Sequence, residues 1–342
     1  MDVWVGRIME SDMMETLEDK KMRENRENHT ENRKYIKELV LSKTLEKCYA
    51  ELIDASIYID QLNNFIDEKI QLSENKVYQL VKYLYENHTL HLKYQLDKDK
   101  WLRRARKYEE KDTQVPKYCF TKTDELSVIP DDEKDKVGIG RLNKEKQPIY
   151  YGCFSDKYFN NYEVALSEVN AIDLDYVNCL DSITTGYLEV IHIGTFDLFM
   201  RGQALPHWID SYNLRIFKLF KKCCETNNKK HLLESHQLCS AFFADILSRK
   251  NHKNLYKVTS LLADIIFENE QVDAIIYESV QVKGAPVIAI KPKALAQKIK
   301  HEKVASLKVE ANLGYGIYYT VPINEGTVDR DLLSWDGIEN ES

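Results

Sequence analysis

The chain has no uninterrupted apolar run of about 18 residues, the length that a membrane-spanning helix requires. Its first residues, MDVWVGRIMESDMMETLEDKK, also lack an apolar run of signal-peptide length. The seven cysteines include no CxxC pair and follow no regular spacing, a pattern typical of reduced thiols in a cytosolic protein. We therefore predict a cytoplasmic protein without a membrane partner.

Positive charge is not in excess, because 48 Lys and Arg stand against 55 Asp and Glu, for a net charge of −7. An acidic chain of this kind is poorly suited to coat nucleic acid, so we expect no direct nucleic-acid partner. The hydrophobic content of 43% is sufficient for a packed core. The 342 residues are enough for two domains, or for one large domain with insertions.

Proline and glycine are absent between residues 35 and 91, and apolar residues there recur at helical spacings. Leu45, Tyr49 and Ile53 follow such spacings in a first helix. Ser73 is suited to cap a second helix. The buried stripe of this second helix is predicted to be Val77, Leu80, Val81 and Leu84. We predict a small all-α domain over residues 1–96.

Histidines and cysteines occur in groups, but their spacing does not suit a metal ion. His88 and His91 lie three apart without an acidic or thiol partner nearby. The later group fits no compact zinc site and consists of Cys223, Cys224, His231, His236 and Cys239. We expect no metal site, and we interpret residues of about 205–250 as a helical insertion.

Three arginines, Arg103, Arg104 and Arg106, follow Trp101 in a strongly charged segment. Such a cluster is typical of an exposed strand edge or helix end. The alternative is an anion clamp, because guanidinium groups bind phosphate through two parallel hydrogen bonds. Composition alone favours the exposed segment.

Two distant stretches carry the strongest functional signal. In residues 140–169, IYYGCF predicts a strand and YEVALSEVN predicts a helix, a layout in which Tyr151 and Glu168 can face one cleft. In residues 272–292, one strand ends at Ser279 and another returns from Gly284. The end of a strand is a common location for binding groups.

The motifs GRLN, PIYYG and ALSEV, followed by DAIIYESV and GAPVIAIKP, resemble the RES domain family over roughly residues 100–292. The resemblance implies an α+β fold similar to that of ADP-ribosyltransferases. It places a catalytic domain over 97–300 and a C-terminal extension over 301–342. Characterised family members are toxins of bacterial toxin–antitoxin pairs that destroy NAD. The implied substrate is NAD, and the implied partners are inorganic phosphate and an antitoxin protein.

Matched by position, the resemblance assigns catalytic roles to Arg141 and Glu168. Glu163 is the alternative carboxylate if the extra residues after Ser155 shift the register. The residues that would bind NAD are Arg104, Arg106, Asn143, Tyr151 and Ser279. The chain departs from the family pattern at Arg103, Glu278 and Pro286, and each departure affects how the NAD would lie.

The implied reaction breaks the bond between nicotinamide and ribose, by phosphorolysis or hydrolysis. Its oxocarbenium-like sugar needs a carboxylate in a water-poor cleft, and its phosphates need arginines. Two other functions stay open: an ADP-ribosyltransferase that modifies a macromolecule, and a non-catalytic RES-like module that binds or regulates. The sequence also leaves open the oligomeric state, including a homo-oligomer.

Overall fold

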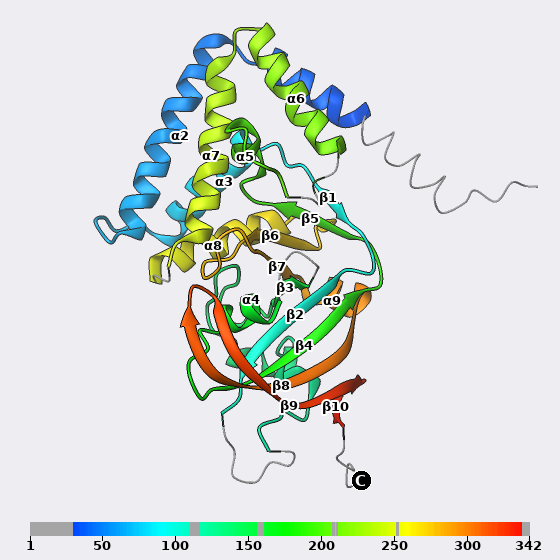
Figure 1. Cartoon of the computed structure of the whole chain (residues 1–342). Coiled ribbons are helices and arrows are strands. Elements are labelled where there is room, and N and C mark those ends of the chain that lie inside the picture. Colours follow the sequence, from blue (N-terminus) through cyan, green and yellow to red (C-terminus); the bar gives the residue numbers. More distant parts are fainter. Residues whose placement is uncertain are drawn as a thin grey trace, which may run out of the picture.

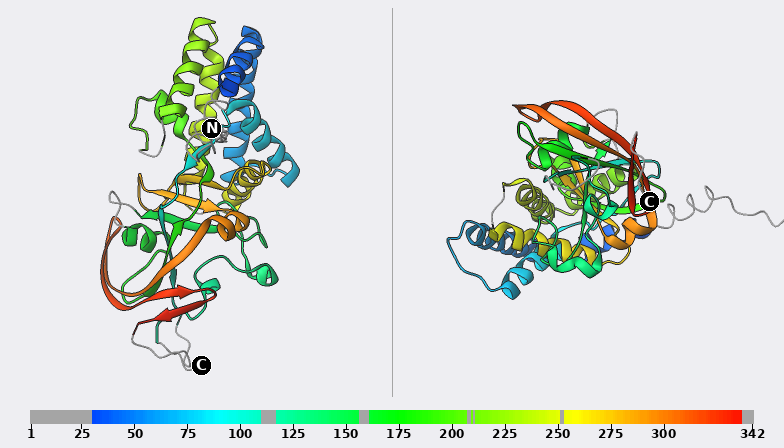
Figure 2. Two further views of the ribbon diagram at one scale, coloured as in Figure 1. Left: turned by 90° about the vertical axis from the view of Figure 1, so that its right-hand side faces the viewer. Right: turned by 90° about the horizontal axis from the view of Figure 1, so that it is seen from below.

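A mixed sheet of ten strands organises the protein, and most of the helices gather at one end of it (Figures 1 and 2). The computed structural model describes residues 30–109, 117–155, 161–206, 209, 211–250 and 253–336. The strand order is β1-β5-β6-β7-β3-β2-β4-β8-β9-β10. Strands β5 and β6 pair in parallel, and the other neighbours pair antiparallel. This mixed architecture is compatible with the predicted α+β class.

The strands lie between Tyr94 and Trp335. They are β1 (Tyr94–Leu96), β2 (Trp101–Lys107), β3 (Tyr150–Ser155), β4 (Tyr176–Thr184), β5 (Leu188–His192), β6 (Ala274–Glu278), β7 (Pro286–Ile290), β8 (Ile299–Gly314), β9 (Ile317–Asp329) and β10 (Leu332–Trp335). Strands β9 and β10 and most of β8 fall in the predicted C-terminal extension, and all three continue the same sheet.

The helices begin with one over residues 30–41. The others are α2 (Leu45–Ile66), α3 (Glu74–His88), α4 (Asn161–Glu168), α5 (Thr195–Met200), α6 (Ser211–Thr226), α7 (Lys230–Ser248), α8 (Lys253–Phe267) and α9 (Pro292–Lys298), with short 3₁₀ turns at Thr123–Glu125 and Asp131–Lys136. Among the described residues, no helix combines the length and apolarity needed to cross a membrane. Of the predicted N-terminal domain, residues 1–29 lie outside the described residues.

The N-terminal helices and the later helices share one apolar cluster. Leu62 of α2, Leu84 of α3, Phe243 of α7 and Leu262 of α8 are all buried in it. The predicted cap of α3 is confirmed, because the Ser73 hydroxyl accepts a hydrogen bond from the amide of Lys76 at 3.3 Å. The predicted stripe of α3 is also buried.

Helix α2 is predicted correctly, but the residues that predict it lie on its solvent side. Leu45, Tyr49 and Ile53 expose 51%, 54% and 41% of their surface. The side that packs is a neighbouring stripe that includes Ala55 and Leu62. The helix therefore has two apolar stripes, and tertiary packing against α7 decides which of them is covered.

Strands β6 and β7 are buried on both faces, which accounts for their continuous apolar sequences. Ile275 and Tyr277 pack in the cluster that contains α3, α7 and α8. Ala274 and Ile276 pack on the opposite face, in the cluster that contains residues of α6 and α9. This alternation turns the side chain of Tyr277 toward the helical face.

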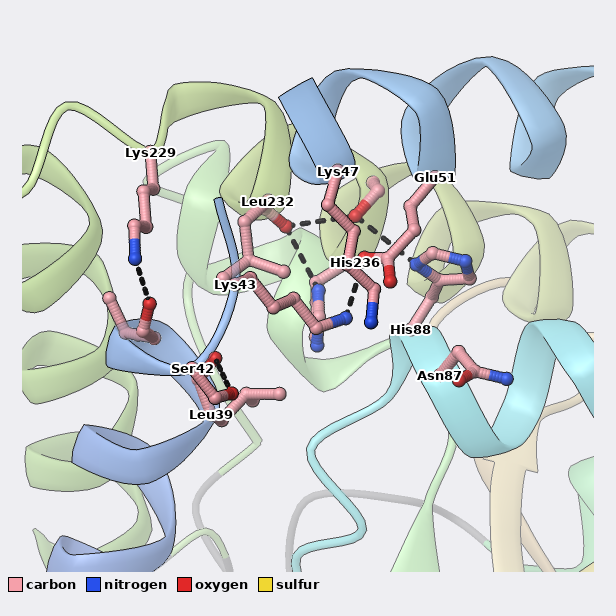
Figure 3. Close-up of polar contacts among 12 residues, drawn as sticks. Leu39, Ser42, Lys43, Lys47, Glu51, Asn87, His88, Lys229, Leu232 and His236 are labelled. Carbon is pink, nitrogen blue, oxygen red and sulfur yellow. Dashed lines mark hydrogen bonds and ion pairs between the residues drawn. The ribbon is translucent and has the colours of Figure 1, made fainter. Parts of the chain in front are cut away.

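Several polar side chains lie together where α2, α3 and α7 meet (Figure 3). Lys43 and Glu51 form an ion pair at 2.6 Å, and Nδ1 of His236 donates to the carbonyl oxygen of Leu232 at 2.9 Å. The Nε2 atoms of His88 and His236 are buried and have no hydrogen-bond partner among the described residues. Burial lowers the pKa of His88 to about 4 and the pKa of His236 well below its ordinary value. Both rings are therefore neutral at pH 7.

Acid is expected to destabilise this helical region. An unfolded histidine takes up its proton near pH 6.5, whereas folded His88 does so only near pH 4. The stability present above pH 6.5 is therefore lost as the pH falls toward 4, by about 3 kcal/mol for His88 alone. Urea unfolding at pH 7 and at pH 4.5 measures the loss. His88→Gln should weaken this pH dependence, and the control His231→Gln, at an exposed position, should not. Equal pH dependence in all three proteins would contradict the account.

Candidate active site

A cavity of about 280 Å³ opens between β2, β3, the end of α4, α8 and the turn after β6. We call it the site cavity. Its polar and aromatic lining comes from segments that are far apart in the sequence. These residues are Arg103, Arg104, Arg141, Tyr151, Glu168, Asn170, Tyr256, Tyr277 and Gln281. Four of the residues predicted from the sequence, Arg104, Arg141, Tyr151 and Glu168, therefore share one cavity.

Ser279 joins this group through a hydrogen bond to Glu168. The Ser279 hydroxyl donates to Oε1 of Glu168, the last residue of α4. The hydroxyl oxygen of Ser279 itself accepts from the backbone amides of Gln281 at 3.1 Å and Val282 at 3.0 Å. Because Ser279 is almost fully buried, these three bonds fix its orientation and hold one oxygen of the carboxylate. Ser279 therefore acts here as a positioning group.

Glu168 is accessible to solvent from the cavity, yet the surrounding walls remove much of its hydration. This burial raises the pKa of Glu168, while the hydrogen bond from Ser279 and the charge of Arg141 oppose the rise. A carboxyl group beside a cation in a poorly hydrated cavity is a common feature of functional sites.

Arg104 is held without a carboxylate. Its Nη1 donates to the carbonyl oxygen of Tyr151 at 3.3 Å, and its guanidinium carbon lies 5.5 Å from the centre of the Tyr150 ring. Its Nε is buried without a hydrogen-bond partner, and no ion pair among the described residues involves it. Burial lowers the pKa of Arg104. A buried guanidinium with an unused donor is suited to bind an anion.

Arg141 lies at the other side of the cavity, near Glu168. Its Nη1 donates to the carbonyl oxygen of Leu247 at 2.9 Å, and its guanidinium carbon lies 5.6 Å from the centre of the Tyr256 ring. These contacts attach Arg141 to α7 and α8. Helix α7, in the predicted insertion, and helix α8 therefore both help to position Arg141.

Arg103 also lines the cavity, but it already has a counter-ion. It forms two hydrogen bonds to Asp181 at 2.5 and 2.6 Å, and it lies 3.5 Å from the centre of the Tyr162 ring. This bidentate pair links β2 to β4 beneath the cavity. Arg103, one of the departures from the family pattern, therefore supports the wall.

Asn143 is a brace for Tyr151. The Tyr151 hydroxyl donates to Oδ1 of Asn143 at 2.9 Å and accepts from the amide of Leu142 at 2.8 Å. The Nδ2 of Asn143 donates to the carbonyl oxygens of Gly138 and Lys144, both at 2.9 Å. Asn143 is buried and is not part of the cavity lining. We interpret it as a residue that fixes the ring of Tyr151.

Gly140 permits this brace. A Cβ atom at position 140 would lie 2.3 Å from Oδ1 of Asn143, whereas one at Gly138 would meet nothing within 4 Å. Gly140→Ala should therefore displace Asn143 and destabilise the fold by about 1–3 kcal/mol. Thermal unfolding measures this effect, with Gly138→Ala as the matched control. Equal melting temperatures for the two variants would contradict the proposed brace.

Arg106 and Glu163 lie apart from the site cavity. Nη1 of Arg106 donates to the carbonyl oxygen of Glu125 at 2.7 Å, and the guanidinium carbon lies 5.7 Å from the Phe120 ring centre. Arg106 lines a different depression. Glu163 is in the first turn of α4, and it is not among the residues that line the cavity.

Two aromatic residues of the cavity were not predicted as site residues. Tyr256 comes from α8 and Tyr277 from β6, and burial raises the pKa of both. The sequence offers no local signal for Tyr256, because its place in the wall depends on how α8 packs against the sheet. Tyr277 directly precedes the Glu278–Ser279 motif, and that position was the available signal.

Comparison with known protein families, with curated proteins and with solved structures finds no match. Within the described parts of the chain, no group of three or more His, Cys, Asp or Glu side chains is arranged to hold a metal ion. The chemistry of the site therefore has to be argued from its own residues.

Proposed function

We propose that this protein cleaves the nicotinamide–ribose bond of NAD, by phosphorolysis or hydrolysis. The observation that carries the proposal is one cavity that holds Glu168, oriented by Ser279, together with Arg141 and Arg104. The RES family resemblance supplies the substrate, and the proposal includes the ADP-ribosyltransferase-like fold of that family. It also includes a cytoplasmic toxin or defence role with an antitoxin protein as partner.

The reaction requires a negative group near the ribose and positive groups near the phosphates. When the glycosidic C1′–N bond breaks, its electron pair leaves with nicotinamide, and the sugar becomes oxocarbenium-like. Glu168 lines the cavity in which this positive charge develops, and its carboxylate is suited to stabilise that charge. Water then forms the new C1′–O bond and loses a proton to solvent, whereas a phosphate oxyanion forms this bond without having to lose a proton. A negative carboxylate favours the transition state more than it favours the bound substrate.

The two arginines are suited to bind phosphate groups. Arg104, which has an unused buried donor, is suited to a phosphate of NAD. Arg141, which lies near Glu168, is suited to hold a phosphate acceptor close to C1′. The ring of Tyr151, fixed by Asn143, provides a face for the nicotinamide.

Expression in bacterial cells tests the proposal. Cellular NAD is expected to fall when the native chain is produced and to stay unchanged when Glu168→Gln is produced at the same level. Loss of NAD with both proteins would point to an effect unrelated to the site. Unchanged NAD with the native chain would contradict the proposed activity.

A second candidate function is ADP-ribosyl transfer to a protein, and one observation favours it. The end of β8, the turn that follows it and strand β9 expose large apolar side chains at alternate positions: Leu313, Tyr315, Ile317, Tyr319, Val321 and Ile323. This hairpin approaches the site cavity, because a Cβ on Gly316 would lie 3.3 Å from Val282 and 3.6 Å from Ser167. Such a surface is typical of protein recognition. Radiolabelled NAD separates the two functions: label in protein supports transfer, and label in free ADP-ribose or its 1-phosphate supports cleavage.

A further inference from the structure

The site cavity is small for the proposed substrate. Its volume is about 280 Å³, just below the range of roughly 300–1,000 Å³ that holds a drug-sized ligand. NAD consists of two nucleotides joined by a diphosphate. The site cavity therefore suits the nicotinamide ribose and a neighbouring phosphate, and the adenosine half of NAD would extend beyond it.

A second cavity of about 470 Å³ lies beside the first one. The two are separated by the β6–β7 turn, residues 279–285, and Tyr277 lines both. Within this turn, Val280 and Gln281 line the site cavity, whereas Gly284 and Ala285 line the second cavity. A ligand that crosses this turn from the site cavity would therefore meet residues that line the second cavity.

The second cavity has the chemistry of a nucleoside site. Its apolar walls come from the end of β5, from α5 and from the segment that follows: Ile193, Leu198, Ala204, Leu205 and Pro206. Such walls suit a flat heteroaromatic base. Glu278 lies at the turn and is exposed, and its Oε1 accepts from the amide of Gly284 at 2.6 Å. A carboxylate fixed in this way is suited to accept hydrogen bonds from the hydroxyls of a ribose.

The turn itself carries a positive charge between the two cavities. Lys283 is exposed in it, and no ion pair between described residues involves Lys283. A diphosphate that crosses the turn would place two negative charges next to this lysine. The acceptor, water or phosphate, must reach C1′ beside Glu168, so it has to bind in the site cavity. The second cavity is therefore not the acceptor site.

We propose that the second cavity binds the adenosine half of NAD, with the diphosphate crossing the β6–β7 turn. This inference rests on the proposed NAD cleavage. It gives α5 and the segment 204–206 a role in substrate selection. It also assigns Glu278, a departure from the family pattern, to the ribose of the adenosine half. The protein should then discriminate strongly between NAD and nicotinamide mononucleotide, which lacks that half.

Steady-state kinetics with both substrates test this assignment. The native chain should show a kcat/KM for NAD at least about 100-fold above that for nicotinamide mononucleotide, equivalent to about 2.7 kcal/mol. Ala204→Trp narrows the second cavity from an exposed position and should lower kcat/KM for NAD by about tenfold or more. The value for the mononucleotide should fall far less. Ala50→Trp, on the exposed side of α2, is the matched control.

Glu278→Gln provides a second variant that keeps an oxygen for the Gly284 amide but loses the negative charge. It should raise KM for NAD with little change in kcat. Equal kcat/KM for NAD and the mononucleotide, or equal losses for both substrates in Ala204→Trp, would overturn the adenosine assignment while leaving NAD cleavage in place. If the folded native chain cleaves neither substrate, the proposed function itself fails.

Discussion

Glu168→Gln is expected to lower the rate of NAD cleavage by about 100- to 1,000-fold while the fold is retained. The amide oxygen of glutamine can still accept the hydrogen bond from Ser279, so the end of α4 stays in place. The negative charge that faces the oxocarbenium-like sugar is lost. Release of nicotinamide measures the rate, and calorimetric titration with NAD tests whether the variant still binds.

Glu163→Gln is the matched control for this experiment. It changes a carboxylate to an amide on the same helix, but at a position that does not line the site cavity. Its rate should equal that of the native chain. Full activity in Glu168→Gln would remove the proposed catalytic group. Loss of activity in Glu163→Gln alone would assign the reaction to the other carboxylate of the motif.

Arg104→Met is expected to raise KM for NAD by about 100-fold or more without lowering the melting temperature. A half-buried guanidinium without a carboxylate partner is costly for the fold, and burial lowers its pKa. Methionine fills much of the same volume and has no charge to desolvate. The Arg104→Met substitution should therefore weaken anion binding without destabilising the fold. Kinetic assays and thermal unfolding on the same protein measure both effects.

Arg106→Met, two residues further along β2, serves as the control for charge in this strand. Arg106 lines the other depression, so its removal should leave KM for NAD unchanged. A large loss of stability in Arg104→Met with normal KM would show that Arg104 has a structural role. Equal KM effects in the two variants would point to a general electrostatic contribution of the strand.

Local sequence patterns predict the elements that carry the site. The expected strands at IYYGCF and at residues 272–277 and the expected helix at YEVALSEVN correspond to β3, β6 and α4. Each has a strong local signal: an apolar strand run, or a helical period next to turn residues. The expectation that Tyr151 and Glu168 face one cleft is confirmed, since both line the site cavity. Arg141 and Arg104 lie in the same cavity.

The features that the sequence does not predict depend on long-range packing. Strand β4 supplies Asp181 as the counter-ion of Arg103, a pairing between residues 78 positions apart. Tyr256 belongs to the wall only because α8 packs against the helical face of the sheet. Asn143 was expected to bind NAD, yet its contacts brace Tyr151. A motif identifies which residues matter more readily than it identifies what each one contacts.

We propose that Glu168 and its neighbours act on the ribose carbon that holds nicotinamide. A proton NMR time course of the purified native chain with NAD, in the presence and in the absence of inorganic phosphate, tests it most directly. The account predicts release of free nicotinamide together with ADP-ribose, or with its 1-phosphate when phosphate is the acceptor. An unchanged NAD spectrum under both conditions, with protein shown to be folded, would contradict it.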